Sequence, residues 1–234
     1  MVELFRTEYD ERSGTMINNY IPVLSCSGEK IKDWFSYSDE QHIMFVASPE
    51  AVLNAPPPKF PLGIKYCRPD DKIFDTEDTW LDLVKKQNHP DLIPAYQLYK
   101  RDIYHKFYMK YRNNFYIISA GWGIIRASYK IPAYNITYSN SKSVPKYSRR
   151  INSDKWNDFN HLKEDSANFD ENSIIILFSG SNYIESFCNM TKFIKNRKII
   201  YYTAQSISKK DGFEYSKYKK NFTNWHYEAA KEYL

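Results

Sequence analysis

The chain has 234 residues, 42% of them hydrophobic, and its 33 Lys and Arg residues exceed its 28 Asp and Glu residues, which gives a formal net charge of +5. This length and hydrophobic content are sufficient for one folded domain and exclude a chain that is disordered throughout. The three cysteines lie far apart without a CxxC pair, and no apolar run approaches the length of a membrane span. We therefore expect a soluble, cytoplasmic protein with reduced thiols that uses no metal and no other cofactor.

The first third of the chain predicts strands separated by an irregular insertion. Residues 1–19 are charged and mixed, and we expect an arm or a short helix there. The apolar run at 20–26 (YIPVLSC) predicts the first strand, and the run at 43–46 predicts a second one. Prolines then predict an irregular surface insertion over about residues 48–70, with a short strand at 63–69.

Two helices are predicted before the central strand. The first begins at about Asp75 or Thr76, because acidic residues follow in its first turn and lysines fall in its last, an order that suits the helix dipole. The second begins at Pro94 and runs past Tyr99, with aromatic and aliphatic residues at spacings of three and four and several basic residues. This second helix leads directly into the central strand.

We expect the fold to be organised around residues 115–139, FYIISAGWGIIRASYKIPAYNITYS. The β-forming run at 115–118 predicts a strand that is buried on both faces. Gly121 and Gly123 flank Trp122, an arrangement that permits a ligand to approach the backbone beside one flat ring. A tight turn with a tryptophan in the core fits the same residues.

The second half of the chain alternates strands with helices after a polar, basic loop at about 139–150. We predict, in chain order, a helix at 153–163, a strand at 174–178, a helix at 184–196, a last strand at 198–203 and an amphipathic helix at 222–234. This alternation predicts a single α/β domain over residues 1–234, built as a three-layer α/β/α sandwich around a central, mostly parallel sheet.

Small polar loops follow three of the predicted strands, at 25–30, 119–123 and 179–183. Because the carboxyl ends of parallel strands meet at one edge of a sheet, we expect these loops to line one crevice. Their backbone N–H groups and hydroxyls suit a phosphate or the edge of a base. None matches a P-loop or a GxGxxG fingerprint, which disfavours ATP and dinucleotides.

Charged residues near these loops are candidates for chemistry or for contact with nucleic acid. Lys30 suits a phosphate or an anionic intermediate, although a lysine after a strand is more often only solvated. Glu29 and Asp71 are candidates for activating water or stabilising a sugar cation. Cys26 is a buried thiol or, if a base lies beside it, a nucleophile. The loop at 139–150 suits contacts to the DNA backbone or is simply solvated. Its basic residues are Lys142, Lys146, Arg149 and Arg150.

Several motifs occur in an order that resembles one known group of proteins. Cys-Ser-x-x-Lys follows the first strand, and Pro-Ala-Tyr-Gln-Leu-Tyr, Ser-Ala-Gly-Trp-Gly-Ile-Ile, Pro-x-Tyr-x-Ile-Thr and Ser-Gly-x-x-Tyr follow it in turn. This order resembles the YaaA-like superfamily, which is related in fold to the uracil-DNA glycosylases. The resemblance covers roughly residues 21–203 and implies a uracil-DNA-glycosylase-like fold. By motif it implies that the site residues are Cys26, Ser27, Lys30, Tyr99, Ser119, Gly121, Trp122, Gly123, Tyr134, Gly180 and Tyr183.

The resemblance further implies a DNA glycosylase that flips out and excises a modified base, in defence against phage. Trp122 or Tyr134 would then lie against the base, and Lys30 or backbone N–H groups would stabilise the leaving base anion. Glu29 or Asp71 would stabilise the sugar cation and position water.

The chain departs from these families at points that bear on its substrate. Asn135 stands where we expect the YaaA-like pattern to have an acidic residue, and the chain lacks the Asp-Pro-Tyr and His-Pro-Ser motifs of ordinary uracil-DNA glycosylases. These differences disfavour uracil as the substrate, and they leave Asn135 or Asn182 to read the base edge. Two other functions stay open, a non-catalytic DNA-binding stress-response protein and an RNA-base-modifying transferase that needs a small-molecule donor. We expect DNA as the partner, no membrane, and a monomer.

Overall fold

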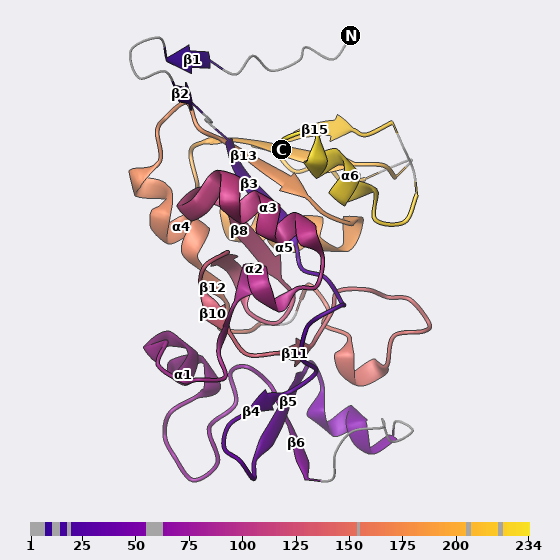
Figure 1. The fold of residues 1–234 in the computed structure, drawn as a ribbon. Coiled ribbons are helices and arrows are strands. Elements are labelled where there is room, and N and C mark those ends of the chain that lie inside the picture. Colours follow the sequence, from indigo (N-terminus) through magenta and orange to yellow (C-terminus); the bar gives the residue numbers. More distant parts are fainter. Residues whose placement is uncertain are drawn as a thin grey trace.

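A seven-stranded sheet forms the centre of the computed structural model, which describes residues 8–10, 15–17, 20–54, 63–153, 155–204, 207–219 and 222–234 (Figure 1). Its order is β12-β9-β8-β3-β13-β14-β15. The strands are β3 (Tyr20–Ser25), β8 (Tyr116–Ser119), β9 (Gly123–Arg126), β12 (Phe159–Asn160), β13 (Ile174–Phe178), β14 (Arg197–Tyr202) and β15 (Glu214–Lys217). Neighbours from β8 to β15 are parallel, whereas β9 is antiparallel to β8, so the predicted mostly parallel sheet is confirmed.

Helices cover both faces of this sheet. Along β3, Leu24 belongs to one core cluster and Val23 to the other, as alternation along a buried strand requires. The Leu24 face packs against α3 (Asp102–Tyr111) and α6 (Trp225–Lys231), and the Val23 face against α4 (His161–Asp165) and α5 (Ile184–Thr191). The arrangement is that of an α/β sandwich. None of the helices within the described ranges is long and apolar enough to cross a membrane.

A second, smaller sheet lies beside the first. It contains β4 (Phe35–Ser36), β5 (His42–Val46), β6 (Ile64–Cys67) and β11 (Tyr134–Asn135), and the packing of Phe45 against Trp122 (ring centroids 5.1 Å apart) joins it to the central sheet. The strand predicted at 43–46 is confirmed. The short strand predicted at 63–69 corresponds to β6. The rest of the insertion was predicted as irregular, but it contains the 3-10 helix Pro49–Asn54, and 55–62 lie outside the described residues.

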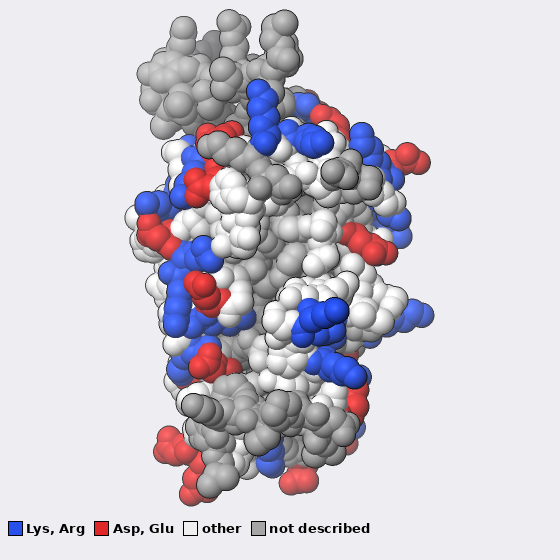
Figure 2. All heavy atoms as spheres, turned by 90° about the vertical axis from the view of Figure 1, so that its right-hand side faces the viewer, with Lys and Arg blue, Asp and Glu red and all other residues white. Residues whose placement is uncertain are grey.

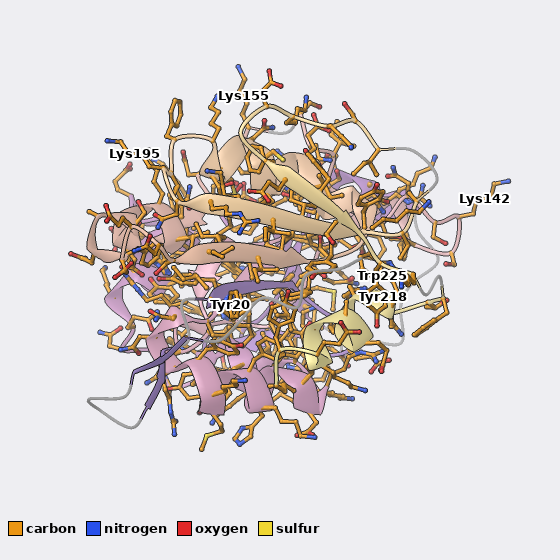
Figure 3. The ribbon with its side chains drawn as sticks, turned by 90° about the horizontal axis from the view of Figure 1, so that it is seen from above. Tyr20, Lys142, Lys155, Lys195, Tyr218 and Trp225 are labelled. Carbon is orange, nitrogen blue, oxygen red and sulfur yellow. The ribbon has the colours of Figure 1, made fainter. Side chains whose placement is uncertain are left out.

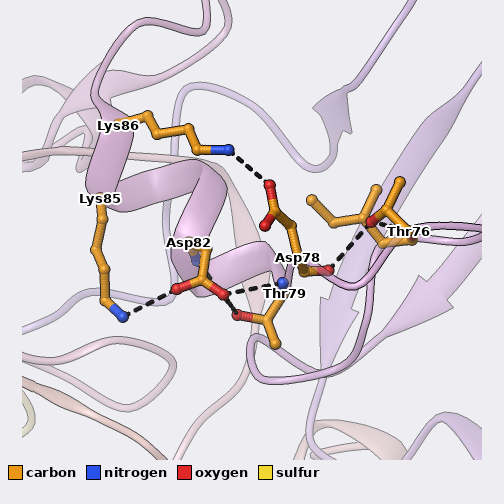
Figure 4. A network of polar contacts seen from close by, with 7 residues as sticks. Thr76, Asp78, Thr79, Asp82, Lys85 and Lys86 are labelled. Atoms are coloured by element: carbon orange, nitrogen blue, oxygen red, sulfur yellow. Dashed lines mark hydrogen bonds and ion pairs between the residues drawn. The ribbon is translucent and has the colours of Figure 1, made fainter.

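Helix α1 (Trp80–Lys86) begins later than predicted from Asp75 or Thr76. Its N-cap is Thr79, whose Oγ1 accepts the N–H of Asp82 (3.2 Å) while the Asp82 carboxylate accepts the N–H of Thr79 (3.0 Å), a reciprocal capping box (Figure 4). Thr76 instead donates its hydroxyl to the carbonyl of Ile73 and closes a turn. The acidic residues that predicted a first helical turn therefore lie mostly in the turn before the helix.

The single helix predicted from Pro94 is broken in two. It forms α2 (Ala95–Leu98) and α3, and Tyr99 between them is extended, with φ −87° and ψ 128°. Tyr99 pairs with Lys30 as an antiparallel bridge, and Lys100 N–H donates to the carbonyl of Glu29 (3.2 Å). Pairing with the loop after β3 thus overrides the helical periodicity.

Other predicted boundaries also change where strands pair. Within the segment predicted as an arm or short helix, residues 8–10 and 15–17 form a two-stranded antiparallel pair, β1 (Glu8–Asp10) and β2 (Thr15–Ile17), and not a helix. Residues 1–7, 11–14 and 18–19 lie outside the described residues. The helix predicted at 153–163 contains strand β12 and only then α4, because β12 pairs with β9. The strand predicted to be the last one is β14, but β15 follows it and pairs with it. Helix α6 confirms the helix predicted at the carboxyl end. Two short strands, β7 (Ile93–Pro94) and β10 (Lys130–Ile131), pair with each other outside both sheets.

Buried polar groups tie β9 to α4. The N–H of Arg126 donates to Nδ1 of His161 (3.2 Å), and its guanidinium pairs with Asp165, which also accepts the Tyr116 hydroxyl (2.6 Å). Burial, together with the nearby Arg126, lowers the pKa of His161 to about 4 from 6.5. The ring is neutral at pH 7, as its role as an acceptor at Nδ1 requires.

We expect the free energy of unfolding to fall as the pH falls from 7 to 5. The unfolded chain protonates this histidine near pH 6.5 and the folded chain only near pH 4, so His161 alone should account for about 2 kcal/mol of the loss. Urea unfolding of the wild type and of His161→Gln at both pH values measures it. The variant should lose less stability than the wild type over this interval, and an equal loss would contradict the prediction.

Candidate functional site

The candidate site lies where the strand order of the central sheet reverses. From β3 the chain proceeds to β8 on one side, whereas from β13, the other neighbour of β3, it proceeds to β14 on the opposite side. Ligands of open α/β sheets bind just past the carboxyl ends of the strands at such a point. The loop beginning at Cys26 follows β3, and the loop beginning at Ser179 follows β13.

The three predicted loops do meet at this edge. Cys26 N–H donates to the carbonyl of Ile118 at the end of β8 (2.9 Å), and Cys26 Sγ lies 3.1 Å from the hydroxyl of Tyr183 in the loop after β13. Ser119 Oγ donates to the Tyr134 hydroxyl (2.8 Å), which lies 2.8 Å from the Tyr99 hydroxyl. We call these residues the Lys30 cluster: Cys26, Lys30, Tyr99, Ser119, Tyr134 and Tyr183.

Three hydroxyl groups of the cluster carry one hydrogen more than the bonds among Ser119, Tyr134 and Tyr99 use. Ser119 Oγ accepts the N–H groups of Gly121 (3.2 Å) and Trp122 (3.1 Å) and gives its hydrogen to Tyr134. The bond between the hydroxyls of Tyr134 and Tyr99 uses one of their two hydrogens, which leaves the other for Cys26, Ser119 or a ligand. Burial raises the pKa of both tyrosines well above 10, so both are protonated at neutral pH.

Lys30 is the charged member of the cluster. It is 8% exposed, and its Nζ lies 4.1 Å from the centre of the Tyr134 ring and 5.9 Å from that of Tyr99. Among the described ion pairs, none involves Lys30. Burial lowers the pKa of its ammonium, and the nearby Cys26 and Asp33 oppose this shift. A buried amine with ring contacts and no carboxylate partner is suited to an anionic or acceptor-rich ligand.

Two tyrosines extend the polar network and were not predicted. The Tyr104 hydroxyl donates to the carbonyl of Ser25 (2.6 Å) and lies 2.8 Å from the hydroxyl of Tyr227 on α6. Ser27, a predicted site residue, is buried beside this network and its Oγ accepts the N–H of Glu29 (3.1 Å). Tyr227 lies too far from the motifs along the sequence for any pattern to indicate it.

The glycines of the central motif are required by packing. A Cβ on Gly121 would lie 2.8 Å from Cδ2 of Tyr134, so glycine allows this ring to rest on the backbone and face Lys30. Gly123 has φ +81°, and a Cβ there would lie 2.3 Å from the carbonyl oxygen of Phe159. At Gly180 no atom lies within 4 Å of a Cβ position, so packing does not require glycine there.

Trp122 does not face a crevice. It is fully buried against Phe45 of the second sheet, so the alternative of a core tryptophan in a tight turn describes it correctly. The ring lies between the two sheets, where burial of its large apolar surface stabilises the fold, so it is not available to contact a ligand. Tyr134, the other aromatic residue expected against a base, does lie in the Lys30 cluster.

The two predicted carboxylates lie outside the Lys30 cluster. Glu29 is exposed and pairs with Arg101 (3.5 Å). Asp71 lies between β6 and α1, where its carboxylate accepts the N–H of Arg68 (2.6 Å) and closes a turn. Asn135 is half-buried on β11.

The basic loop is only partly exposed. Lys142 and Lys146 are exposed, and Lys142 projects outward at the opposite end of the molecule from Lys195 (Figure 3). Arg149 turns inward and donates to the carbonyl of Val144 (2.6 Å). Tyr147 is buried near β5.

Arg150 differs most from the expectation of a residue that contacts the DNA backbone. It is 3% exposed, forms two hydrogen bonds with Asp158 (2.8 and 2.6 Å), and donates to the carbonyl of Ala120 (2.9 Å). Its guanidinium also lies 3.9 Å from the centre of the Trp156 ring. This buried pair anchors the loop that carries Ser119, so the structure places Arg150 in a supporting position.

Two neighbouring grooves of about 400 and 290 Å³ open beside the start of α5. Asn152, Asn182 and Glu185 line both, so the predicted Asn182 lies at a groove, and Glu185 is a carboxylate that the sequence did not indicate. Tyr138 lines the smaller groove, and its ring meets that of Tyr183 edge to face (5.2 Å). Tyr183 thus contacts Tyr138 of the groove wall through its ring and Cys26 of the Lys30 cluster through its hydroxyl.

Figure 2 shows the side of the molecule from which the loop 139–150 projects. Lys and Arg side chains, interspersed with Asp and Glu, lie on both sides of a central strip that is largely uncharged. Within the described parts of the chain, no group of three His, Cys, Asp or Glu side chains is placed to hold a metal ion.

Comparisons with known proteins add no relative: no family model matches the chain, and no curated protein or solved structure matches it.

Proposed function

We propose that this chain is a DNA glycosylase with a uracil-DNA-glycosylase-like fold, which excises a modified nucleobase in defence against phage. The observation that carries the proposal is the buried Lys30, which has no ion-pair partner among the described residues and lies at the point where the strand order reverses. The YaaA-like order of motifs supports the same reading, because its loops meet in the Lys30 cluster.

The cluster suits the departure of a base. When the bond between C1′ and the base nitrogen breaks, its electron pair stays on the base, and negative charge develops on the ring. The ammonium of Lys30 and the spare hydrogen of Tyr99 or Tyr134 are donors that would stabilise this charge without reorganising.

The grooves supply the remaining parts. Glu185 is a carboxylate at the groove that Tyr183 connects to the cluster, so we assign it the role of stabilising the sugar cation and positioning water, in place of Glu29 and Asp71. Asn182 would contact the base edge or the sugar. Lys142 and Lys146 are exposed and suit the flanking phosphates.

The test is incubation of the purified protein, without added metal, with duplex DNAs that each carry one class of modified base. Mass spectrometry follows free bases, and alkaline cleavage follows abasic sites. Release of one class would establish the activity and its substrate together. Binding to every DNA without release would overturn it in favour of a non-catalytic DNA-binding protein, and binding to RNA alone would favour an RNA-modifying transferase.

A further inference from the structure

Base excision leaves a deoxyribose whose open-chain form carries an aldehyde at C1′. In the proposed reaction this carbon would lie next to the departed base, and therefore next to Lys30. The lysine is 8% exposed, its nearest ring is that of Tyr134, and no described carboxylate pairs with it. Lysines that are desolvated in this way are the ones that attack carbonyl groups, because more of the amine is neutral.

The contacts of Lys30 also differ from those of its neighbour Lys32. Lys32 Nζ is paired with Asp91, and its side chain is 38% exposed. The amine of Lys32 is thus engaged in an ion pair, whereas no ion pair among the described residues involves Lys30. Burial lowers the pKa of Lys30, which has no such partner. Two lysines two positions apart are therefore a reactive candidate and a matched control.

We propose that Lys30 forms an imine with the C1′ aldehyde of an abasic site, so that the protein is also an abasic-site lyase. This inference rests on the proposed glycosylase function, since it takes the product of that reaction as its substrate.

The chemistry balances without a further reagent. Lys30, which acts as an ammonium donor during excision, first gives a proton to the departing base or to solvent and becomes neutral. The lone pair of its Nζ then forms a bond to C1′, one proton moves from the nitrogen to the carbonyl oxygen, a second comes from solvent, and loss of water gives the protonated imine. Water then takes a proton from C2′, and the electron pair left behind expels the 3′ phosphate, which breaks the strand and leaves an α,β-unsaturated imine. Addition of water to this imine releases an unsaturated aldehyde and restores the amine.

The experiment uses a duplex oligonucleotide with one abasic site already present, so that base excision is not required. Sodium borohydride reduces the imine to a stable amine, and the covalent complex is measured by gel shift under denaturing conditions. We expect trapping by the wild type and by Lys32→Arg, and loss of trapping in Lys30→Arg, which keeps the positive charge but cannot form an imine. Peptide mapping should place the adduct on Lys30.

Absence of the adduct with the wild type, or an adduct on another lysine, would overturn the inference. Circular dichroism and thermal unfolding establish that Lys30→Arg is folded, and the mapped wild-type adduct decides the matter without any variant. Base release from modified DNA is measured separately. Release of a base without trapping would support the proposed glycosylase and overturn the lyase. Trapping without release of any base would support the lyase and overturn the glycosylase.

Discussion

Replacement of Lys30 by methionine should lower the rate of base release by about 100- to 1,000-fold, the usual effect of removing one donor that stabilises developing negative charge. The loss should appear in kcat, with KM changed little, because the ammonium interacts with the base most strongly once the bond to the sugar has begun to break. Steady-state kinetics of base release on the substrate identified from the panel of modified DNAs would measure it.

Lys32→Met is the matched control for this prediction. Lys32 lies in the same loop but pairs with Asp91 away from the Lys30 cluster, so base release should stay near the wild-type rate. In Lys30→Met the methionine retains much of the length of the lysine side chain, so the packing against Tyr134 changes little. A folded Lys30→Met variant that releases base at the wild-type rate would remove Lys30 from the proposed mechanism.

Replacement of Arg150 by methionine should lower the free energy of unfolding by about 3–5 kcal/mol, because it leaves the Asp158 carboxyl in the interior without its partner. Asp158 is 16% exposed and would lose both of its hydrogen bonds from the guanidinium. Urea unfolding measures the change. The double variant Arg150→Met with Asp158→Leu should recover much of the loss, since no charge then remains buried.

Lys142→Met provides the comparison for Arg150, because Lys142 is exposed on the same loop. Its stability should stay within about 0.5 kcal/mol of the wild type, while its affinity for DNA should fall and depend less on salt. If Arg150→Met instead left stability unchanged and weakened only DNA binding, Arg150 would return to the role of a backbone contact.

Local patterns determined the strands and the edge at which the candidate site lies. The strands predicted at 43–46 and 174–178 correspond to β5 and β13. A short apolar run between turn residues favours a buried strand whatever the topology of the rest of the chain. Parallel strands then bring their carboxyl ends together, which is why Cys26, Ser119 and Tyr183 could be expected at one place from the sequence alone.

Contacts between distant segments decided what those residues do. Helical spacing continues through Tyr99, but pairing with Lys30 ends the helix there and brings the two side chains together. Trp122 was expected to contact a ligand, but it packs against the second sheet in the core. Arg150 was expected to contact the DNA backbone, but it is buried in an ion pair with Asp158. Composition and spacing report the structural preferences of each segment. Burial, charge pairing and strand pairing depend on surfaces that meet only in the folded chain, and these tertiary contacts can outweigh the local preferences.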